Sequence, residues 1–262
     1  MSVHPIARSG SETVRPPHDN YCLIKMSRRQ PKQLEFTLKT WGGKRKGAGR
    51  KPKNGKAGVT HQARPAFASH HPVHVTMKVR RDVVGSLRRK SMFRCLHDAF
   101  VRGCQRNGFH VTDWSVQCDH IHAIVEGKNS ESLSRGIQGL TIRLARNLNK
   151  ALGRTGPVFA DRYHMRALRT PREVRNCLAY VLGNARRHGA ALSPLYVDAF
   201  SSAAYFDGWR QKPQVGTIVP RGGRKPVADP ITWLRRTGWR RKGLLDPTAT
   251  PGSRRSRGFR DA

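Results

Sequence analysis

The chain has 262 residues, of which 51 are Lys or Arg and 16 are Asp or Glu, so its formal net charge is +35. This excess is far more than solubility requires, and it indicates a polyanionic partner, most simply nucleic acid. The sequence shows no long apolar run, no basic helix with a large apolar face and no secretory signal pattern, which argues against a membrane protein. The five cysteines form no C-x-x-C pair, which argues against a zinc ribbon or a disulfide framework and favours a reducing cytoplasm. We therefore expect a cytoplasmic protein and, given its basic charge, association with the nucleoid.

The positive charge is concentrated at the two ends of the chain, where Gly, Lys and Pro are common and apolar residues are few. We expect an N-terminal arm at 1–65, which includes "WGGKRKGAGRKPK", and a basic C-terminal extension at 196–262. Neither end has enough apolar surface to form a core alone, so both are predicted to be largely flexible. The middle, 66–195, has the patterns of a globular domain. The first 25 residues differ in composition from the rest, and we expect the natural start at Met26.

The middle of the chain alternates between strand and helix patterns. The stretch 109–127 is typical of a hairpin that turns near Cys118 and Asp119. The last helix has a clear beginning, because Thr170 can cap it and Glu173 can complete a capping box. In chain order the predicted elements are a strand at 74–79, a helix at 85–108, strands at 109–117 and 120–127, a helix at 129–153, a strand at 158–169 and a helix at 170–189. This order predicts an α+β domain in which helices pack on an antiparallel sheet.

Two histidines stand one residue apart in the apolar stretch "CDHIHAIVEG", at residues 118–127. Alternate side chains of a strand point to the same face, so His120 and His122 are expected to project together, away from Ile121. Two neighbouring imidazoles on a rigid strand make half of a metal site. A pair of histidines with a purely structural role has the same spacing, and the pattern alone leaves both interpretations open.

The last predicted helix places Tyr180 and Asn184 about 40° apart on the helical wheel, at the edge of an apolar stripe. A phenol and a carboxamide are therefore expected to emerge together from one edge of this helix. A phenolate can attack a DNA phosphorus and form a covalent phosphotyrosine, and a divalent ion can neutralise the phosphate during the transfer. The alternative is that Tyr180 only packs its ring at the helix edge.

The H-x-H strand, followed about sixty residues later by Y-x-x-x-N within "GPVFADRYHMRALRTPREVRNCLAYVLGNARRHG", resembles a known family. It is similar to the tyrosine transposases associated with repetitive extragenic palindromes (REP), in the insertion-sequence-200-like branch of the HUH endonucleases. The resemblance implies their ferredoxin-like HUH fold and a nuclease acting on single-stranded hairpin DNA as a monomer or homodimer. Tyr180 would be the nucleophile that forms a 5′-phosphotyrosine, while His120, His122 and Asn184 would bind Mg²⁺ or Mn²⁺. Many members have proline after the asparagine, where this chain has Ala185.

The basic ends contain further candidates for contact with DNA. "GRKP" occurs at 49–52 and again at 223–226, and it resembles the AT-hook, although a phosphate-binding tail without sequence preference explains it as well. Trp233 and Trp239 lie among arginines, where they can either stack on unpaired bases or form a small packed helix. The candidate nucleic-acid-binding residues are Lys44, Arg45, Lys46, Arg50, Lys51, Arg187, Arg224, Lys225, Arg240 and Arg241.

Two other functions remain open from the sequence alone. One is a regulator that binds DNA hairpins without cleaving them, and the other is a metal-dependent nuclease whose nucleophile is water. A covalent adduct between DNA and Tyr180 distinguishes the tyrosine mechanism from both.

Overall fold

The computed structural model describes residues 67–188, 193–216 and 223–252. The predicted N-terminal arm, the expected start at Met26 and the candidates from Lys44 to Lys51 lie outside these residues. The elements are β1 (Val73–Lys78), α1 (Lys90–Gly103), β2 (Gln105–Arg106), β3 (Phe109–Val116), β4 (His120–Gly127), α2 (Ser130–Ala151), β5 (His164–Ala167), α3 (Pro171–Leu182), α4 (Asn184–Arg187), β6 (Tyr196–Val197), the 3₁₀ helix η2 (Ser202–Tyr205), β7 (Gln214–Val215), α5 (Trp233–Arg236) and the 3₁₀ helix η3 (Gly238–Lys242).

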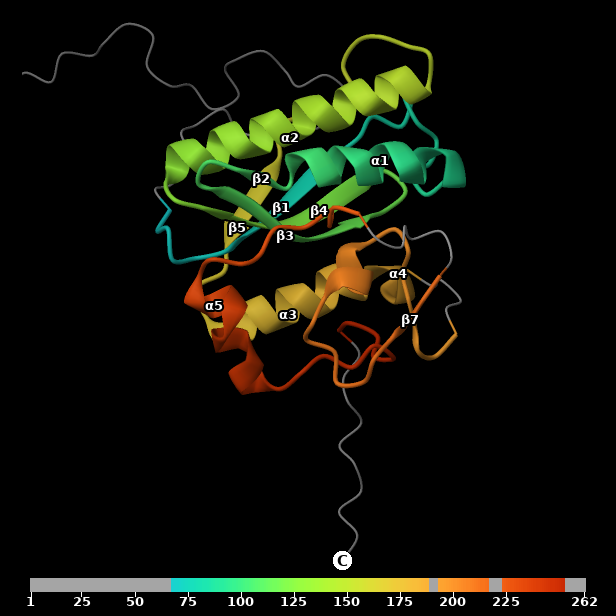
Figure 1. Ribbon diagram of the computed structural model, residues 1–262. Helices are drawn as coiled ribbons and strands as arrows, with labels where there is room; N and C mark the ends of the chain where they lie inside the picture. Colours follow the sequence, from blue (N-terminus) through green and yellow to red (C-terminus); the bar gives the residue numbers. More distant parts are fainter. Residues whose placement is uncertain (1–66, 189–192, 217–222, 253–262) are drawn as a thin grey trace, which may run out of the picture. The chain divides into compact units, whose positions relative to one another are not determined.

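Five strands form one sheet in the order β2-β3-β4-β1-β5, and each neighbouring pair is antiparallel. Helices α1 and α2 cover one face of this sheet, while α3, α4 and α5 lie beneath the other face (Figure 1). The predicted α+β class, with helices packed on an antiparallel sheet, is confirmed. None of the helices in the described ranges is long and apolar enough to cross a membrane.

The alternation of side chains along β4 explains how the sheet joins the two helical layers. Ile121, Ala123 and Val125 belong to the core that the sheet shares with α1 and α2, whereas Ile124 belongs to the core shared with α3. Because alternate residues share a face, His120 and His122 lie on the side of α3. The predicted hairpin is therefore confirmed, together with the expected separation of its histidines from its core residues.

Two elements are shorter than predicted. Helix α1 begins at Lys90 instead of 85, because the amide of Leu87 donates to the carbonyl of Cys118 (2.8 Å) and ties this stretch to the β3–β4 turn. Strand β5 has four residues, and all four pair with β1. Helix α2 agrees with its prediction, since it begins directly after Asn129, whose side chain caps it.

The helix predicted at 170–189 begins as expected but is interrupted. Thr170 accepts a hydrogen bond from the amide of Glu173, whose carboxylate accepts from the amide of Thr170, so the capping box is present. Helix α3 ends at Leu182, and a separate turn, α4, begins after Gly183. Pro251 packs against Gly183 so closely that a Cβ there would lie 2.7 Å from the Cγ of Pro251. Tyr180 is in α3 and Asn184 is in α4, so the angle expected between them on a single helical wheel does not apply.

The expectation of a flexible C-terminal extension is wrong for residues 196–216 and 223–252. Trp239 is fully buried, and it shares a core with Leu234, Leu245 and the apolar side of α3. These apolar residues are few, but they cover a helix that has its own apolar stripe and therefore do not need to form a core alone. Trp239 is consequently not available for base stacking, and the small packed helix is the correct alternative.

A buried ion pair joins this extension to the sheet. Arg235 donates two hydrogen bonds to Asp113 on β3, at 2.7 and 2.9 Å, and both side chains are almost completely buried. The neighbouring carboxylate of Glu126 on β4 accepts hydrogen bonds from the amides of Ile231 and Thr232 and from the Thr232 hydroxyl. Burial raises the pKa of Glu126, although these hydrogen bonds oppose the shift. The start of α5 is thus fixed to the sheet by polar contacts as well as by apolar packing.

Replacing Arg235 with Ala is expected to lower the free energy of unfolding by about 3–5 kcal/mol, because Asp113 would remain buried without its partner. Urea denaturation of the Arg235→Ala variant measures this loss. The matched control is Arg236→Ala, which removes the exposed neighbouring arginine of the same helix and should change stability by less than about 1 kcal/mol. Equal stabilities of the two variants would contradict the anchoring role.

Candidate active site

His120 stands at the start of β4 with its ring held in place. Its Nδ1 donates to the Oδ1 of Asp119 (2.7 Å), and the other carboxylate oxygen of Asp119 accepts from the Nε of Arg81 (3.0 Å). The hydrogen bond to His120 is the main reason why the pKa of Asp119 is lowered. Because Nδ1 carries this proton, Nε2 of His120 is left as the atom that can bind an ion.

His122 is buried between β1 and α3, with only 4% of its surface exposed. Its Nδ1 lies 3.2 Å from the Nε2 of His74 and 3.1 Å from the hydroxyl oxygen of Thr76, both on β1. Its ring is nearly perpendicular to that of His120, with the centroids 4.7 Å apart. Burial, reinforced by the neighbouring His74, lowers the pKa of His122 to about 3. The imidazole is therefore neutral near pH 7, which is the form that binds metal ions.

Tyr180 extends from α3 to this pair of histidines. Its hydroxyl oxygen lies 3.3 Å from the Nε2 of His122, and the two rings meet edge to face with centroids 5.1 Å apart. The guanidinium of Arg187, on α4, lies 5.7 Å from the centre of the phenol ring. The structure therefore brings the tyrosine and the H-x-H strand into hydrogen-bonding contact across the sheet–helix interface.

Asn184 is the first residue of α4, and it is fully buried. Neither atom of its carboxamide has a hydrogen-bond partner among the residues that the structure describes, so it contacts neither His120 nor His122 in this way. A buried amide without partners is costly, and a bound cation is one group that can satisfy its oxygen. The described part of the chain contains no group of three or more His, Cys, Asp or Glu side chains arranged to hold an ion.

Three residues of the site were not identified from the sequence: His74, Thr76 and Asp119. His74 and Thr76 alternate on their strand and face the same side, but their contact with His122 depends on the pairing of β1 with β4. This pairing joins segments 46 to 48 residues apart, and no local pattern indicates it. Asp119 directly precedes His120, and a carboxylate next to a candidate metal ligand is a signal that could have identified it.

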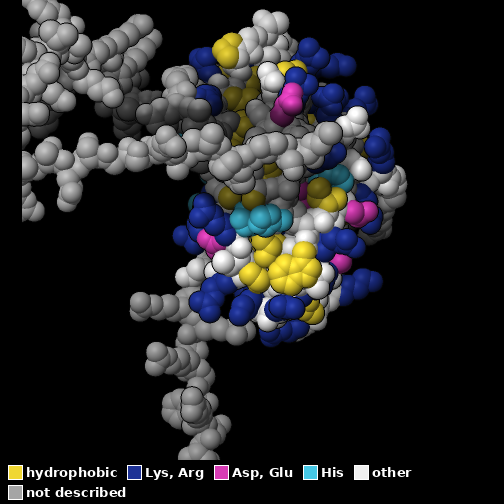
Figure 2. Space-filling model, turned by 90° about the vertical axis from the view of Figure 1, so that its left-hand side faces the viewer, with side chains coloured by type: hydrophobic (Ala, Val, Ile, Leu, Met, Phe, Trp, Pro, Cys, Tyr) yellow, Lys and Arg dark blue, Asp and Glu magenta, His cyan; other side chains and the backbone are white. Residues whose placement is uncertain are grey.

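The predicted DNA-binding residues are distributed over several surfaces. Arg187 lies beside Tyr180, whereas Arg240 contacts Trp239 and pairs with Asp207. Arg241 stacks on Trp233, which is 50% exposed. Figure 2 shows a face of the molecule on which Lys and Arg side chains surround an apolar patch. In the second "GRKP", Arg224 and Lys225 are exposed, but Pro226 is buried and its carbonyl accepts from the indole of Trp114. This copy is therefore fixed to the domain and is not a free hook.

The neutral, buried histidines predict an acid-sensitive fold. The pKa of His74 is lowered to about 4, mainly by burial, and that of His122 to about 3, whereas both are near 6.5 in the unfolded chain. Their contribution to stability is complete above pH 6.5 and is lost as the pH falls toward these folded-state values. Between pH 7 and pH 5 the metal-free protein should lose on the order of 3 kcal/mol of unfolding free energy. Urea denaturation at several pH values measures this loss. If the unfolding free energy of the His74→Gln variant depends on pH as steeply as that of the parent protein, the buried histidines are not its cause.

Comparisons with known proteins found one family model and a solved structure similar to this chain. Residues 68–183 match the family model described as "Transposase IS200 like". A solved structure of a REP-associated tyrosine transposase bound to a REP hairpin is similar with a TM-score of 0.45 and 16% sequence identity, over 66% of this chain and 100% of that chain. No curated protein matches the chain. The matched region includes β1, the H-x-H strand and Tyr180, so this part of the chain is similar to the IS200-like transposases.

Proposed function

We propose that this protein nicks and rejoins single-stranded hairpin DNA through a covalent phosphotyrosine at Tyr180. The observation that supports this most directly is the 3.3 Å contact between the Tyr180 hydroxyl and the Nε2 of His122, within the region that matches the family model of IS200-like transposases. A tyrosine that only packed at a helix edge would not need to meet an H-x-H pair across the sheet–helix interface. The net charge of +35 supports a nucleic-acid substrate independently.

In the proposed reaction the Tyr180 phenol gives its proton to water, and the phenolate oxygen attacks a DNA phosphorus. The bond between this phosphorus and the 3′ oxygen breaks, and the departing oxygen takes a proton from water, which leaves a 5′-phosphotyrosine and a free 3′-OH. Attack of a 3′-OH on the phosphotyrosine reverses the step and rejoins a strand. Edge-to-face packing on His122 and the nearby guanidinium of Arg187 fix the direction of the phenol, so the nucleophile is oriented before DNA binds.

His120, His122 and Asn184 would hold a Mg²⁺ or Mn²⁺ ion. When bound, such an ion neutralises the non-bridging phosphate oxygens and orients the phosphate. The second contacts of the two imidazoles support this role: Asp119 fixes the ring of His120, and His74 with Thr76 surrounds the Nδ1 of His122. Ligand histidines in metal sites are typically oriented in this way.

The proposed substrate is an imperfect hairpin from repetitive extragenic palindromes, as the sequence resemblance implies. Incubation of the full chain with such hairpin oligonucleotides and Mn²⁺, followed by denaturing electrophoresis, tests this proposal. We expect a nick at one position and a free 3′-OH. Tight hairpin binding without any nick would favour the regulator, and would contradict the proposed enzyme.

The N-terminal arm is expected to contribute affinity without choosing the cleavage position. Deleting residues 1–60 should weaken binding to all DNA and flatten its salt dependence, because each lost phosphate contact reduces the log–log slope by about 0.9. Binding across a salt series, with the nick mapped on one hairpin, measures both effects. The region 207–262 is unsuitable for a matched deletion, because it contains the buried Arg235 and Trp239. An unchanged slope, or a shifted nick, would contradict this division of roles.

A further inference from the structure

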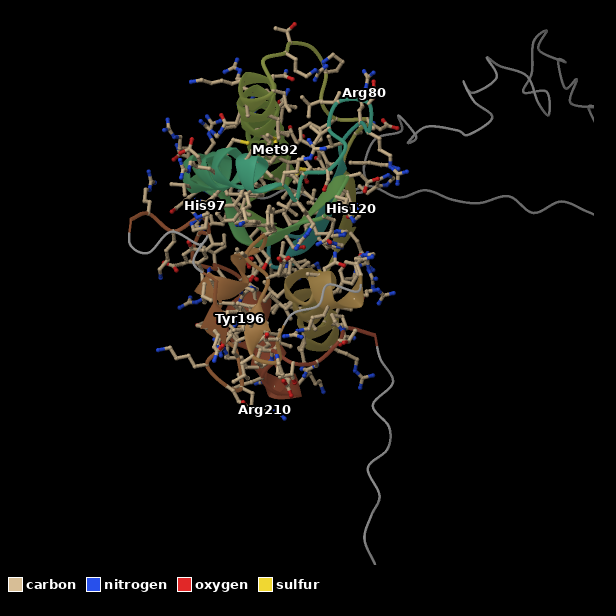
Figure 3. The ribbon with its side chains drawn as sticks, turned by 90° about the vertical axis from the view of Figure 1, so that its right-hand side faces the viewer. Arg80, Met92, His97, His120, Tyr196 and Arg210 are labelled. Carbon is tan, nitrogen blue, oxygen red and sulfur yellow. The ribbon has the colours of Figure 1, made fainter. Side chains whose placement is uncertain are left out.

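A cavity of about 570 Å³ opens between the α3–α4 corner and the C-terminal extension. Its lining includes Asn176, Tyr180 and Gly183 from the α3–α4 corner, which form the first wall, and Tyr196, Trp209 and Arg210 from the extension, which form the second wall. Figure 3 shows Tyr196 and Arg210 in the layer beneath the sheet, together with α3. The volume lies within the range of about 300–1,000 Å³ that is usual for small-ligand sites. The second wall comes from residues beyond the family match at 68–183.

Hydrogen bonds hold the wall from the extension in position. The amide of Arg210 donates to the carbonyl of Leu245 (2.7 Å), and the amide of Leu245 donates to the carbonyl of Gly208 (3.0 Å). The indole of Trp209 donates to the carbonyl of Ala203 (2.9 Å), which fixes the direction of its ring. From the other side, Arg186 donates to the carbonyls of Pro247 (3.1 Å) and Tyr196 (2.8 Å). The cavity is therefore built by the fold and does not require a ligand to form.

The lining combines positive charge with flat aromatic surface. Four arginines contribute to it, namely Arg175, Arg186, Arg187 and Arg210. Of the two lining carboxylates, Asp198 is paired with Arg88 through two hydrogen bonds of 2.8 Å, and Asp246 accepts hydrogen bonds from Thr248. Tyr196 is 39% exposed. An anionic ligand with a flat, partly apolar body fits this combination, and a nucleotide is such a ligand.

We propose that the cavity binds one unpaired nucleotide of the DNA strand next to the phosphate that Tyr180 attacks, and this inference rests on the proposed function. Tyr180 both lines the cavity and contacts His122, so the cavity lies beside the residue that would attack the phosphate. The base would stack on Tyr196, and Arg210 would face the backbone phosphate. Asn176 lies one helical turn before Tyr180, and its amide can form hydrogen bonds with a base edge. The extension would thereby take part in choosing where the strand is cut.

The test uses the full chain with Tyr180→Phe, so that DNA is not consumed, and a REP-type hairpin with single-stranded flanks on both sides. Each flanking base is replaced in turn by an abasic site, and affinity is measured by fluorescence anisotropy. We expect one position beside the cut site at which the abasic change weakens binding by about tenfold. Adding Tyr196→Ala should reduce this loss to less than about twofold, because the base then has no ring on which to stack. The matched control Trp233→Ala removes another exposed aromatic ring outside the cavity and should retain the tenfold loss.

A second pair of variants tests the charge. Arg210→Ala should weaken binding of the flanked hairpin by about fivefold or more but leave a hairpin without flanks unaffected. Arg146→Ala removes an exposed arginine from α2, in the layer on the other face of the sheet, and should change the affinity for neither hairpin. If the protein binds the hairpin but its affinity is the same wherever the abasic site is placed, the nucleotide site is overturned and the proposed function is not. If the Tyr180→Phe protein without any cavity substitution does not bind the hairpin, the proposed function is overturned, and the inference is overturned with it.

Discussion

Replacing Tyr180 with Phe is expected to lower the rate of hairpin cleavage on the order of 10³-fold or more, while hairpin affinity changes less than about threefold. The change removes only the oxygen that lies 3.3 Å from His122, and the ring can keep its edge-to-face packing on the imidazole. Binding should persist because it depends on arginines and on DNA shape instead of on this oxygen. Single-turnover cleavage and anisotropy measure the two quantities separately.

The chain provides a matched control for this variant. The hydroxyl of Tyr205 lies 3.2 Å from the Nε2 of His97, a tyrosine–histidine contact of nearly the same length outside the site. Tyr205→Phe should therefore leave the cleavage rate within about twofold of the parent protein. Wild-type cleavage by Tyr180→Phe, or an equal loss in both variants, would show that the tyrosine mechanism is wrong.

The second large effect is expected at the H-x-H strand. His120→Ala and His122→Ala should each weaken Mn²⁺ binding by about 10²-fold or more, and should remove metal-dependent cleavage. Asn184→Ala should weaken Mn²⁺ binding and cleavage less than the histidine variants do, because a neutral amide oxygen binds the ion less strongly than an imidazole does. Calorimetric titration with Mn²⁺ gives a readout that does not depend on cleavage. His97→Ala, which removes a histidine outside the site, is the control and should leave Mn²⁺ affinity unchanged.

An outcome in which both strand variants bind Mn²⁺ as tightly as the parent protein would contradict the metal assignment. Asn184 has a separate test, because its amide is fully buried without a partner among the described residues. If only its burial matters, Asn184→Ala should be at least as stable as the parent protein and should keep its Mn²⁺ affinity. A reduced Mn²⁺ affinity in a stable variant would support the amide as a ligand.

Local patterns in the sequence were sufficient for much of the fold. The alternation in 118–127 placed His120 and His122 on one face of a strand, and the capping box at Thr170 fixed the start of α3. Both features depend on residues within a few positions of one another. They did not predict that the helix edge with Tyr180 faces the histidines, and the contact between Tyr180 and His122 supplies this information.

The parts that could not be predicted depend on contacts between distant segments. The helix break at Gly183 involves Pro251, which is 68 positions later in the chain, and glycine alone does not require a break. The packing of Trp239 was missed because the extension appears polar when its composition is averaged, although its few apolar residues meet the apolar side of α3. The contact of His74 with His122 likewise follows only from the pairing of β1 with β4.

The most direct test of the central claim is to trap the protein–DNA adduct and identify the linked residue. The full chain is incubated with a labelled REP-type hairpin and Mn²⁺, denatured, digested with protease and analysed by mass spectrometry. The proposed mechanism predicts a single nucleotide-bearing peptide whose modified residue is Tyr180, together with a free 3′-OH on the released strand. Cleavage that leaves a free 5′-phosphate without any adduct, or an adduct on another residue, would contradict it.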